Sequence, residues 1–153
     1  MSIPPYEVAE TIRRNKARYC HWSDTVRYDL FSRIALPDAK FDFVDREGQI
    51  LTMNGVVHSF PDLDSFCKHF TAANTGIDAF HVIDPGAMEM VSEDEVKAVF
   101  GVTFGIGARG SDDGLAIAGA GQYHEVWKKV EGEWFIASCR MMRLHWKAQV
   151  ISA

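Results

Sequence analysis

A carboxylate, a phenol and an imidazole are the groups of this chain whose types and setting suit chemistry on a small molecule. Tyr19 and Asp24 lie in the helix-like stretch TIRRNKARYCHWSDTVRYDLFSRI, and His81 lies in the extended stretch DAFHVIDPG. A carboxylate that orients an imidazole beside an apolar pocket makes a general base, and a phenol can donate to an oxygen on which charge develops. Together they would move a proton between carbon and oxygen without a cofactor.

Each of these residues also has a purely structural interpretation. Asp24 precedes a second helical pattern and could be its N-cap, because Asp accepts hydrogen bonds from the first backbone N–H groups of a helix. Tyr19 could fill the core, and a histidine on a strand often packs in a core or an interface. Tyr19 and Asp24 are five positions apart, so both reach one cavity only if the helix ends or kinks near Trp22.

Helices are predicted for the first part of the chain. Apolar residues recur at helical intervals from Val8 to Cys20, which predicts a helix that ends near residues 21–23. The stretch TVRYDLFSRIA predicts a second helix, closed by Pro37. The basic residues of the first helix are interpreted as a solvated face: Arg13, Arg14, Lys16 and Arg18.

Strands are predicted for most of the remainder. From Lys40 the pattern turns extended, with Glu47-Gly48 and Asn54-Gly55 as turn signals, and PDLDSFCKHFTAAN predicts one more helix. Residues 78–91, 94–108, 115–130 and 131–150 then read as long antiparallel strands. Helices followed by antiparallel strands predict an α+β fold, and 153 residues suit one domain over 1–153.

The predicted sheet needs cover on both faces. Val96, Ala98, Phe100, Val102 and Phe104 alternate with a mixed set, so one face is strongly apolar. We expect that face to enclose a cavity under the helices and the other face to pair with a second subunit, as a homodimer or homotrimer. The small residues 116–121 would leave space inside a curved sheet.

Composition and motifs exclude several classes of function. A net charge of −5 argues against a nucleic-acid surface, and no apolar run is long enough to cross a membrane. No dinucleotide, Walker or serine-hydrolase motif is present, and no histidine spacing suits a metal, so we expect neither cofactor nor metal. The other histidines are interpreted as surface or interface residues, and the three cysteines as buried thiols of a cytoplasmic protein: His21, His58, His69, His124, His145, Cys20, Cys67 and Cys139.

The layout resembles the SnoaL-like branch of the nuclear transport factor 2-like superfamily, and within it the scytalone dehydratase-like proteins. The segments RYCHWSDTVRYDLFSRIALPDAKFDF, AFHVIDPGAMEMVSEDEV, YHEVWKKVEGEW and RLHW carry the likeness over nearly the whole chain. The resemblance implies a cone-shaped α+β barrel around a pocket and cofactor-free dehydration. It also implies that Asp24 and His81 take the places of the family's aspartate and catalytic histidine.

The chain departs from that pattern at several positions. Ser23 and Phe43 stand where scytalone dehydratase has tyrosines, and its second pocket histidine falls near Ala120, where Gln122, Tyr123 or His124 could replace it. Scytalone itself is therefore not the expected substrate. Arg140 or Arg143 could reach the pocket and orient a substrate carboxylate or phenolate. The residues expected to bind substrate are Phe43, Trp22, Phe66, Tyr123 and Arg140.

The sequence thus predicts a cofactor-independent dehydratase or isomerase for a small cyclic, polyketide- or terpenoid-like metabolite. His81, held by Asp24, would remove a proton next to a carbonyl, and Tyr19 would donate to the developing enolate. Two alternatives stay open. Asp24 could instead activate a hydroxyl or water in a cyclase or epoxide-opening enzyme, or the domain could only bind a ligand or form dimers.

Overall fold

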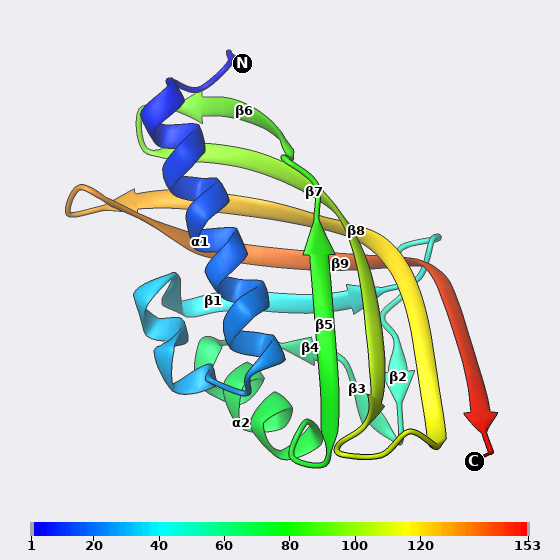
Figure 1. Ribbon diagram of the computed structural model, residues 1–153. Coiled ribbons are helices and arrows are strands. Elements are labelled where there is room, and N and C mark those ends of the chain that lie inside the picture. Colours follow the sequence, from blue (N-terminus) through cyan, green and yellow to red (C-terminus); the bar gives the residue numbers. More distant parts are fainter. Residues whose placement is uncertain (1, 153) are drawn as a thin grey trace.

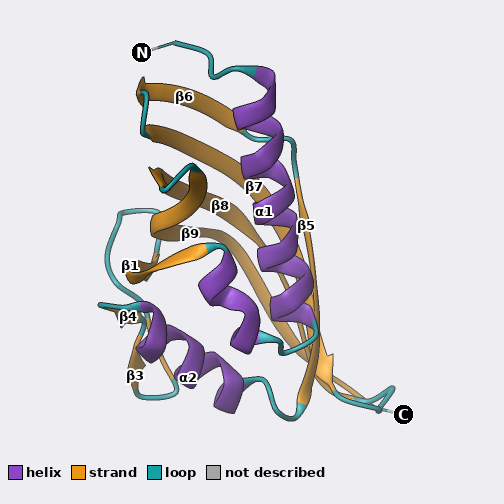
Figure 2. Ribbon diagram, turned by 90° about the vertical axis from the view of Figure 1, so that its left-hand side faces the viewer, coloured by secondary structure: helices purple, strands orange, loops and turns teal. Residues whose placement is uncertain are grey.

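Helices cover one side of a strongly curved sheet in the computed structural model, which describes residues 2–152 (Figures 1 and 2). The elements are α1 (Tyr6–Asp24), the 3₁₀ helix η1 (Tyr28–Arg33), β1 (Ala35–Val44), β2 (Thr52–Met53), β3 (Val56–Val57), β4 (Ser59–Phe60), α2 (Leu63–Ala73), β5 (Ile77–Ile83), β6 (Ala87–Ser92), β7 (Glu95–Ala108), β8 (Gly114–Val130) and β9 (Glu133–Ile151). The α+β prediction is confirmed.

The first helix is longer by one residue than its pattern predicted. α1 follows Pro5 and runs through Asp24, where Thr25 donates from its backbone N–H to the carbonyl of His21. Val26 then adopts a φ of 56°, a left-handed conformation that a β-branched residue rarely takes and that turns the chain sharply. Asp24 is therefore the last residue of one helix, and not the N-cap of the next.

The second predicted helix is reduced to η1. The chain enters β1 at Ala35, so Pro37 lies inside a strand instead of closing a helix. β1 pairs in parallel with β9, and this long-range pairing overrides the local helical pattern. Pro37 falls where the register shifts between Ala35 and Lys40, an irregularity that tolerates the missing backbone donor.

The sheet has the order β4-β1-β9-β8-β7-β5, and β6 pairs with the N-terminal part of β7. Apart from β1 with β9, neighbouring strands are antiparallel. The predicted third helix is confirmed as α2, whose N-cap Asp62 accepts the backbone N–H of Ser65 at 2.8 Å. Figure 2 shows α1, η1 and α2 together on the concave side of the sheet, with α1 alongside β5.

The long strands alternate as predicted in β7 but not in β9. In β7, Val96, Ala98, Phe100 and Val102 are all buried. In β9, two register shifts interrupt the alternation, one opposite Val126/Trp127 and one opposite Ala120/Gly121. After each such bulge the inward-facing set moves by one residue. The buried or cavity-lining residues of β9 are therefore Trp134, Ile136, Cys139, Met141, Arg143 and Trp146.

The basic residues of α1 do not form one solvated face. Arg14 and Arg18 are exposed, but Lys16 is completely buried and pairs with Glu125 of β8 at 2.6 Å. Lys16 lies one turn from Ile12 and one turn from Cys20, both of which are buried, so it belongs to the core-facing stripe of the helix.

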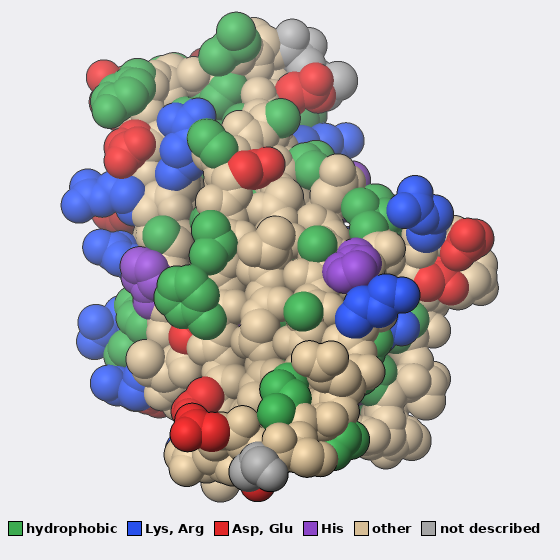
Figure 3. All heavy atoms as spheres, turned by 45° about the vertical axis from the view of Figure 1, so that its right-hand side comes forward, with side chains coloured by type: hydrophobic (Ala, Val, Ile, Leu, Met, Phe, Trp, Pro, Cys, Tyr) green, Lys and Arg blue, Asp and Glu red, His purple; other side chains and the backbone are tan. Residues whose placement is uncertain are grey.

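The outer side of the sheet carries few charges at its centre. Figure 3 shows Lys, Arg, Asp and Glu side chains mainly towards the margins of one face, with scattered hydrophobic side chains between them. On β5, Phe80 and Val82 are 66% and 53% exposed, because they alternate with the half-buried His81. Pairing of this sheet with a second subunit stays a prediction. Within residues 2–152 no helix is long and apolar enough to span a bilayer.

Candidate active site

Asp24 and His81 meet where the end of α1 lies against β5. Asp24 Oδ1 lies 2.5 Å from Nδ1 of His81, and Asp24 Oδ2 accepts the backbone N–H of His81 at 3.2 Å. A carboxylate only accepts, so Nδ1 carries the shared proton and Nε2 is left free. The side chains are 11% and 18% exposed, which keeps the pair largely out of water.

His81 forms part of the wall of a cavity of about 130 Å³ that is partly open to solvent. The lining comes from both helices, η1 and six strands, and most of it is aromatic or aliphatic. The few polar groups in the lining are those of Tyr19, Ser23, Tyr28, Asn74, His81, Tyr123 and Arg143. A concave, mostly apolar space with a few convergent polar groups is typical of a small-molecule site.

One row of residues across the sheet builds the wall next to His81. His81 of β5 pairs with Phe104 of β7, which pairs with Gly119 of β8, which pairs with Trp146 of β9. The ring of Phe104 lies over Gly119 so closely that a β-carbon there would overlap it. Centroid distances of 5.8 Å from His81 to Phe104 and 5.9 Å from Phe104 to Trp146 show a continuous aromatic surface. Gly119 of β8 therefore leaves the room that the Phe104 ring occupies.

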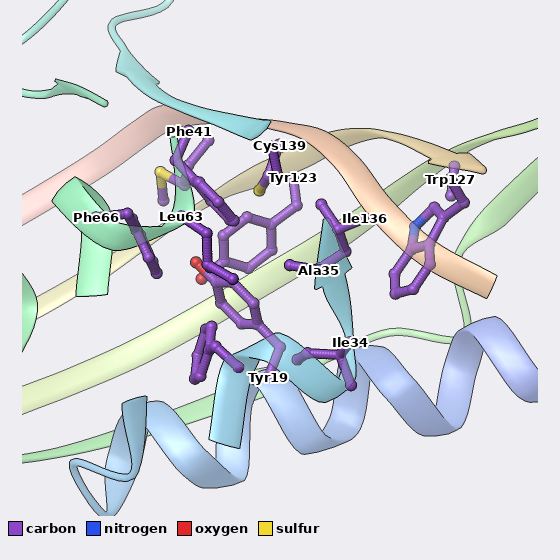
Figure 4. Packing of buried hydrophobic residues seen from close by; sticks show 14 of the residues in the cluster. Tyr19, Ile34, Ala35, Phe41, Leu63, Phe66, Tyr123, Trp127, Ile136 and Cys139 are labelled. Carbon is purple, nitrogen blue, oxygen red and sulfur yellow. The ribbon is translucent and has the colours of Figure 1, made fainter. Parts of the chain in front are cut away.

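Tyr19 and Tyr123 bring two phenol groups to the same cavity. Their rings meet edge to face at 5.5 Å, and Figure 4 shows both residues in the centre of the core, with their hydroxyl ends close together. Burial raises the pKa of each phenol well above its usual value. Both groups therefore stay protonated at neutral pH and can serve as hydrogen-bond donors.

Arg143, and not Arg140, is the arginine of the cavity. Arg140 lies on the outer face, where its guanidinium is 3.5 Å from Asp42. Arg143 lines the cavity, lies over the ring of Trp146 at 4.7 Å and approaches Met53 Sδ at 3.9 Å. Among the described residues no carboxylate lies within salt-bridge distance of Arg143. Strict alternation from Trp134 and Ile136 would turn Arg140 inward. The bulge between Ile136 and Ser138 shifts the inward-facing set by one residue, so Arg143 faces the cavity instead.

The other residues expected to bind substrate divide in the same way. Phe43, Phe66 and Tyr123 line the cavity. Trp22 is absent from the described lining and instead packs against Phe31 at 6.3 Å. Sequence reasoning placed Phe104 on the apolar face expected to enclose the cavity but missed Trp146 as a lining residue, although Trp146 is a large aromatic on a predicted strand.

The remaining histidines and the cysteines lie apart from the dyad. His58 is buried, contrary to the surface assignment, because its Nδ1 donates to Val56 and its ring packs on Phe43 and Phe60. Burial, reinforced by the neighbouring His58, lowers the pKa of His69. In the part of the chain that the structure describes, no cluster of His, Cys, Asp and Glu suits a metal ion. Cys20 and Cys139 are buried free thiols, and Cys67 is half-buried.

Fold and site together define a cone-shaped α+β domain with a carboxylate–imidazole pair in an aromatic small-molecule pocket. The chain belongs to the SnoaL-like family, whose domain model matches residues 6–140. It is 35% identical over 147 residues to FGR4 of Gibberella zeae, named a probable cyclase, with 96% of this chain and 97% of that protein covered.

Solved structures of low sequence identity share the fold. A candidate scytalone dehydratase from Novosphingobium aromaticivorans superposes with a TM-score of 0.75 at 15% identity, covering 94% of this chain and 89% of that chain. A hexachlorocyclohexane dehydrochlorinase, LinA type 2, superposes with a TM-score of 0.72 at 14% identity over the same two shares. A nuclear transport factor 2-like protein from Salmonella enterica gives 0.70 at 16%, covering 90% and 92%. The predicted family and cone fold are confirmed.

Proposed function

We propose that this protein is a cofactor-independent lyase or isomerase that acts on a small cyclic, polyketide- or terpenoid-like metabolite by general acid–base proton transfer. The contact between Asp24 and His81 at the wall of an aromatic cavity carries this proposal. Asp24 fixes the Nδ1–H tautomer, so Nε2 is the base that removes a proton from carbon next to a carbonyl. General acid–base catalysis of this kind supplies about 10²–10⁴-fold.

Tyr19 and Tyr123 supply the second half of the mechanism. As the C–H bond breaks, charge moves to the carbonyl oxygen, and the two buried phenols donate hydrogen bonds to it. The proton held on His81 then returns to a leaving hydroxyl, which departs as water, or to another carbon, which gives an isomer. Preorganised donors in a site that excludes water stabilise such charge strongly.

Arg143 is the substrate-orienting residue of this proposal. Its guanidinium has no carboxylate partner among the described residues. It lies over the ring of Trp146 on β9, which is two strands away from β7, where Phe104 packs against His81. A carboxylate, phenolate or acidic enol on the substrate would complete its ion pair. The cavity then favours a ring system that reaches from His81 to Arg143.

A cyclase is the second candidate, supported by the name of the 35% identical relative FGR4. In that mechanism the dyad takes a proton from a hydroxyl group or a water, whose oxygen attacks an epoxide carbon. The C–O bond of the epoxide breaks, and the proton on His81 passes to the released alkoxide. The same tyrosines and arginine would bind the product.

The test compares metabolite extracts incubated with wild-type protein, with His81→Ala and with His145→Ala, whose exposed histidine lies on β9 outside the described cavity lining. A product lighter by one water that requires His81 identifies a dehydratase, and an isomeric product identifies an isomerase or a cyclase. If mass spectrometry finds no change across polyketide and terpenoid extracts, the proposal is overturned in favour of a binding module. The same change with His81→Ala would overturn the role of His81 as the base.

A further inference from the structure

A charged pair lies behind the tyrosines, where the proposed mechanism does not use it. Lys16 and Glu125 are both completely buried, with Lys16 Nζ at 2.6 Å from Glu125 Oε1. Burying an ion pair is costly, and apolar side chains of the same volume often serve stability as well or better. The pair therefore invites an explanation other than stability.

The ammonium of Lys16 is held against both tyrosine rings. Nζ lies 3.7 Å from the ring centroid of Tyr19 and 3.3 Å from that of Tyr123. Its contacts are therefore the carboxylate of Glu125 and the faces of the two rings. Two rings that share one cation are fixed relative to each other, and with them the directions of their hydroxyl groups.

Two neutral groups hold the negative partner in place. Glu125 accepts Trp127 Nε1 at 2.8 Å and the thiol of Cys139 at 3.5 Å. Figure 4 shows Trp127 well separated along the sheet from Tyr19 and Tyr123. Of the two charges, the ammonium is the one in contact with the tyrosine rings, while the charge of Glu125 helps to raise the pKa of Tyr123.

We infer that Lys16 is a positioning residue of the oxyanion site: from behind the rings it aims the hydroxyls of Tyr19 and Tyr123 into the cavity and strengthens them as donors. This inference rests on the proposed function, in which those hydroxyls bind the enolate oxygen. A positive charge against the face of a phenol ring favours electron-rich partners of its hydroxyl group, and Glu125 offsets part of the effect. Lys16 touches no reacting atom and acts through the two tyrosines.

The test measures the binding of para-nitrophenolate, an anion that mimics an enolate, and of para-nitrotoluene, its neutral counterpart. The variant Lys16→Met/Glu125→Gln removes both charges while preserving size, and should bind the phenolate about tenfold more weakly. The affinity for para-nitrotoluene should change by less than about twofold. A merely structural pair would weaken both ligands alike, and that result would overturn the inference.

A double-mutant cycle separates this effect from Arg143, which also attracts the phenolate. In a Tyr19→Phe/Tyr123→Phe background, the loss caused by neutralising the pair should shrink to less than about twofold. Persistence of the full loss without the hydroxyls, or a wild-type protein that does not prefer the phenolate, would also overturn the inference.

A second variant keeps the test independent of one protein's folding. Lys16→Gln/Glu125→Gln also removes both charges and places two amides that can hydrogen-bond to each other, and the same result is expected from it. Because this experiment measures binding alone, it can fail while the metabolite test succeeds, and the reverse.

Discussion

Replacing Asp24 by Asn preserves the shape of the side chain and removes its charge. Asp24 uses two oxygens, one for Nδ1 of His81 at 2.5 Å and one for the backbone N–H at 3.2 Å. Asn has a single acceptor and can serve only one of these donors. Its NH₂ group, if turned towards Nδ1, would require the opposite tautomer, in which Nε2 carries the proton and cannot act as a base.

The structure sets the size of this effect. A hydrogen bond to a charged group contributes about 1.5–3 kcal/mol and a neutral one about 0.5–1.5 kcal/mol. Because the dyad is largely buried, Asp24→Asn should lower the free energy of unfolding by about 1–2 kcal/mol, or about 2–4 °C in Tm for each kcal/mol. The tautomer change should lower turnover by at least about 10²-fold.

Nitrogen-15 NMR of the histidine side chains measures the tautomer directly, without a known substrate. In the wild-type protein the proton of His81 should reside on Nδ1, and in Asp24→Asn a substantial fraction should move to Nε2. Asp42→Asn is the matched control, because Asp42 pairs with the exposed Arg140 and does not contact His81. If His81 keeps the same tautomer in Asp24→Asn, the carboxylate does not orient the ring and the reasoning is refuted.

Three further predictions concern the core. Lys16→Met should lower the free energy of unfolding, measured by chemical denaturation, by about 3–5 kcal/mol, because it leaves Glu125 buried without a cationic partner. Lys16→Met/Glu125→Gln should recover most of that loss. Equal losses in the two variants would contradict this prediction. Gly121→Ala should cost about 1–3 kcal/mol or more, since a β-carbon would overlap the backbone of β9, while Gly105→Ala, with open space around it, should cost less than about 1 kcal/mol. Burial raises the pKa of the Cys20 thiol to about 11, so in the folded protein its alkylation by iodoacetamide should be slow at neutral pH and accelerate only as pH rises towards that value. Fast labelling of native protein at neutral pH, measured by peptide mass spectrometry, would show that Cys20 is not sealed.

Sequence periodicity correctly predicted the elements in which apolar residues repeat at one regular interval throughout. β7 alternates without interruption, and α2 starts at its cap and carries Phe66 on its buried face, so both were predictable. The contact between Asp24 and His81 spans 57 positions and was suggested by the family resemblance, not by spacing.

The errors have identifiable physical causes. Arg140 was expected in the cavity because strict alternation cannot foresee the bulge of β9 between Ile136 and Ser138, which turns Arg143 inward instead. Lys16 was assigned to solvent by its charge, although its spacing from Ile12 and Cys20 placed it on the buried stripe of α1. The position of Lys16 on the helix therefore predicted its burial better than its charge did. Its charge is explained by the ion pair with Glu125 of β8.

The central claim is that His81 and Asp24 transfer protons to and from carbon. Deuterium exchange into bicyclic ketones such as tetralone and decalone in heavy water tests it most directly. The account predicts that wild-type protein accelerates exchange next to the carbonyl by at least about 10²-fold for ketones that the cavity accepts, and that His81→Ala and Asp24→Asn abolish the acceleration. Exchange that is equally fast with His81→Ala, or no acceleration of any ketone that binds, would contradict it.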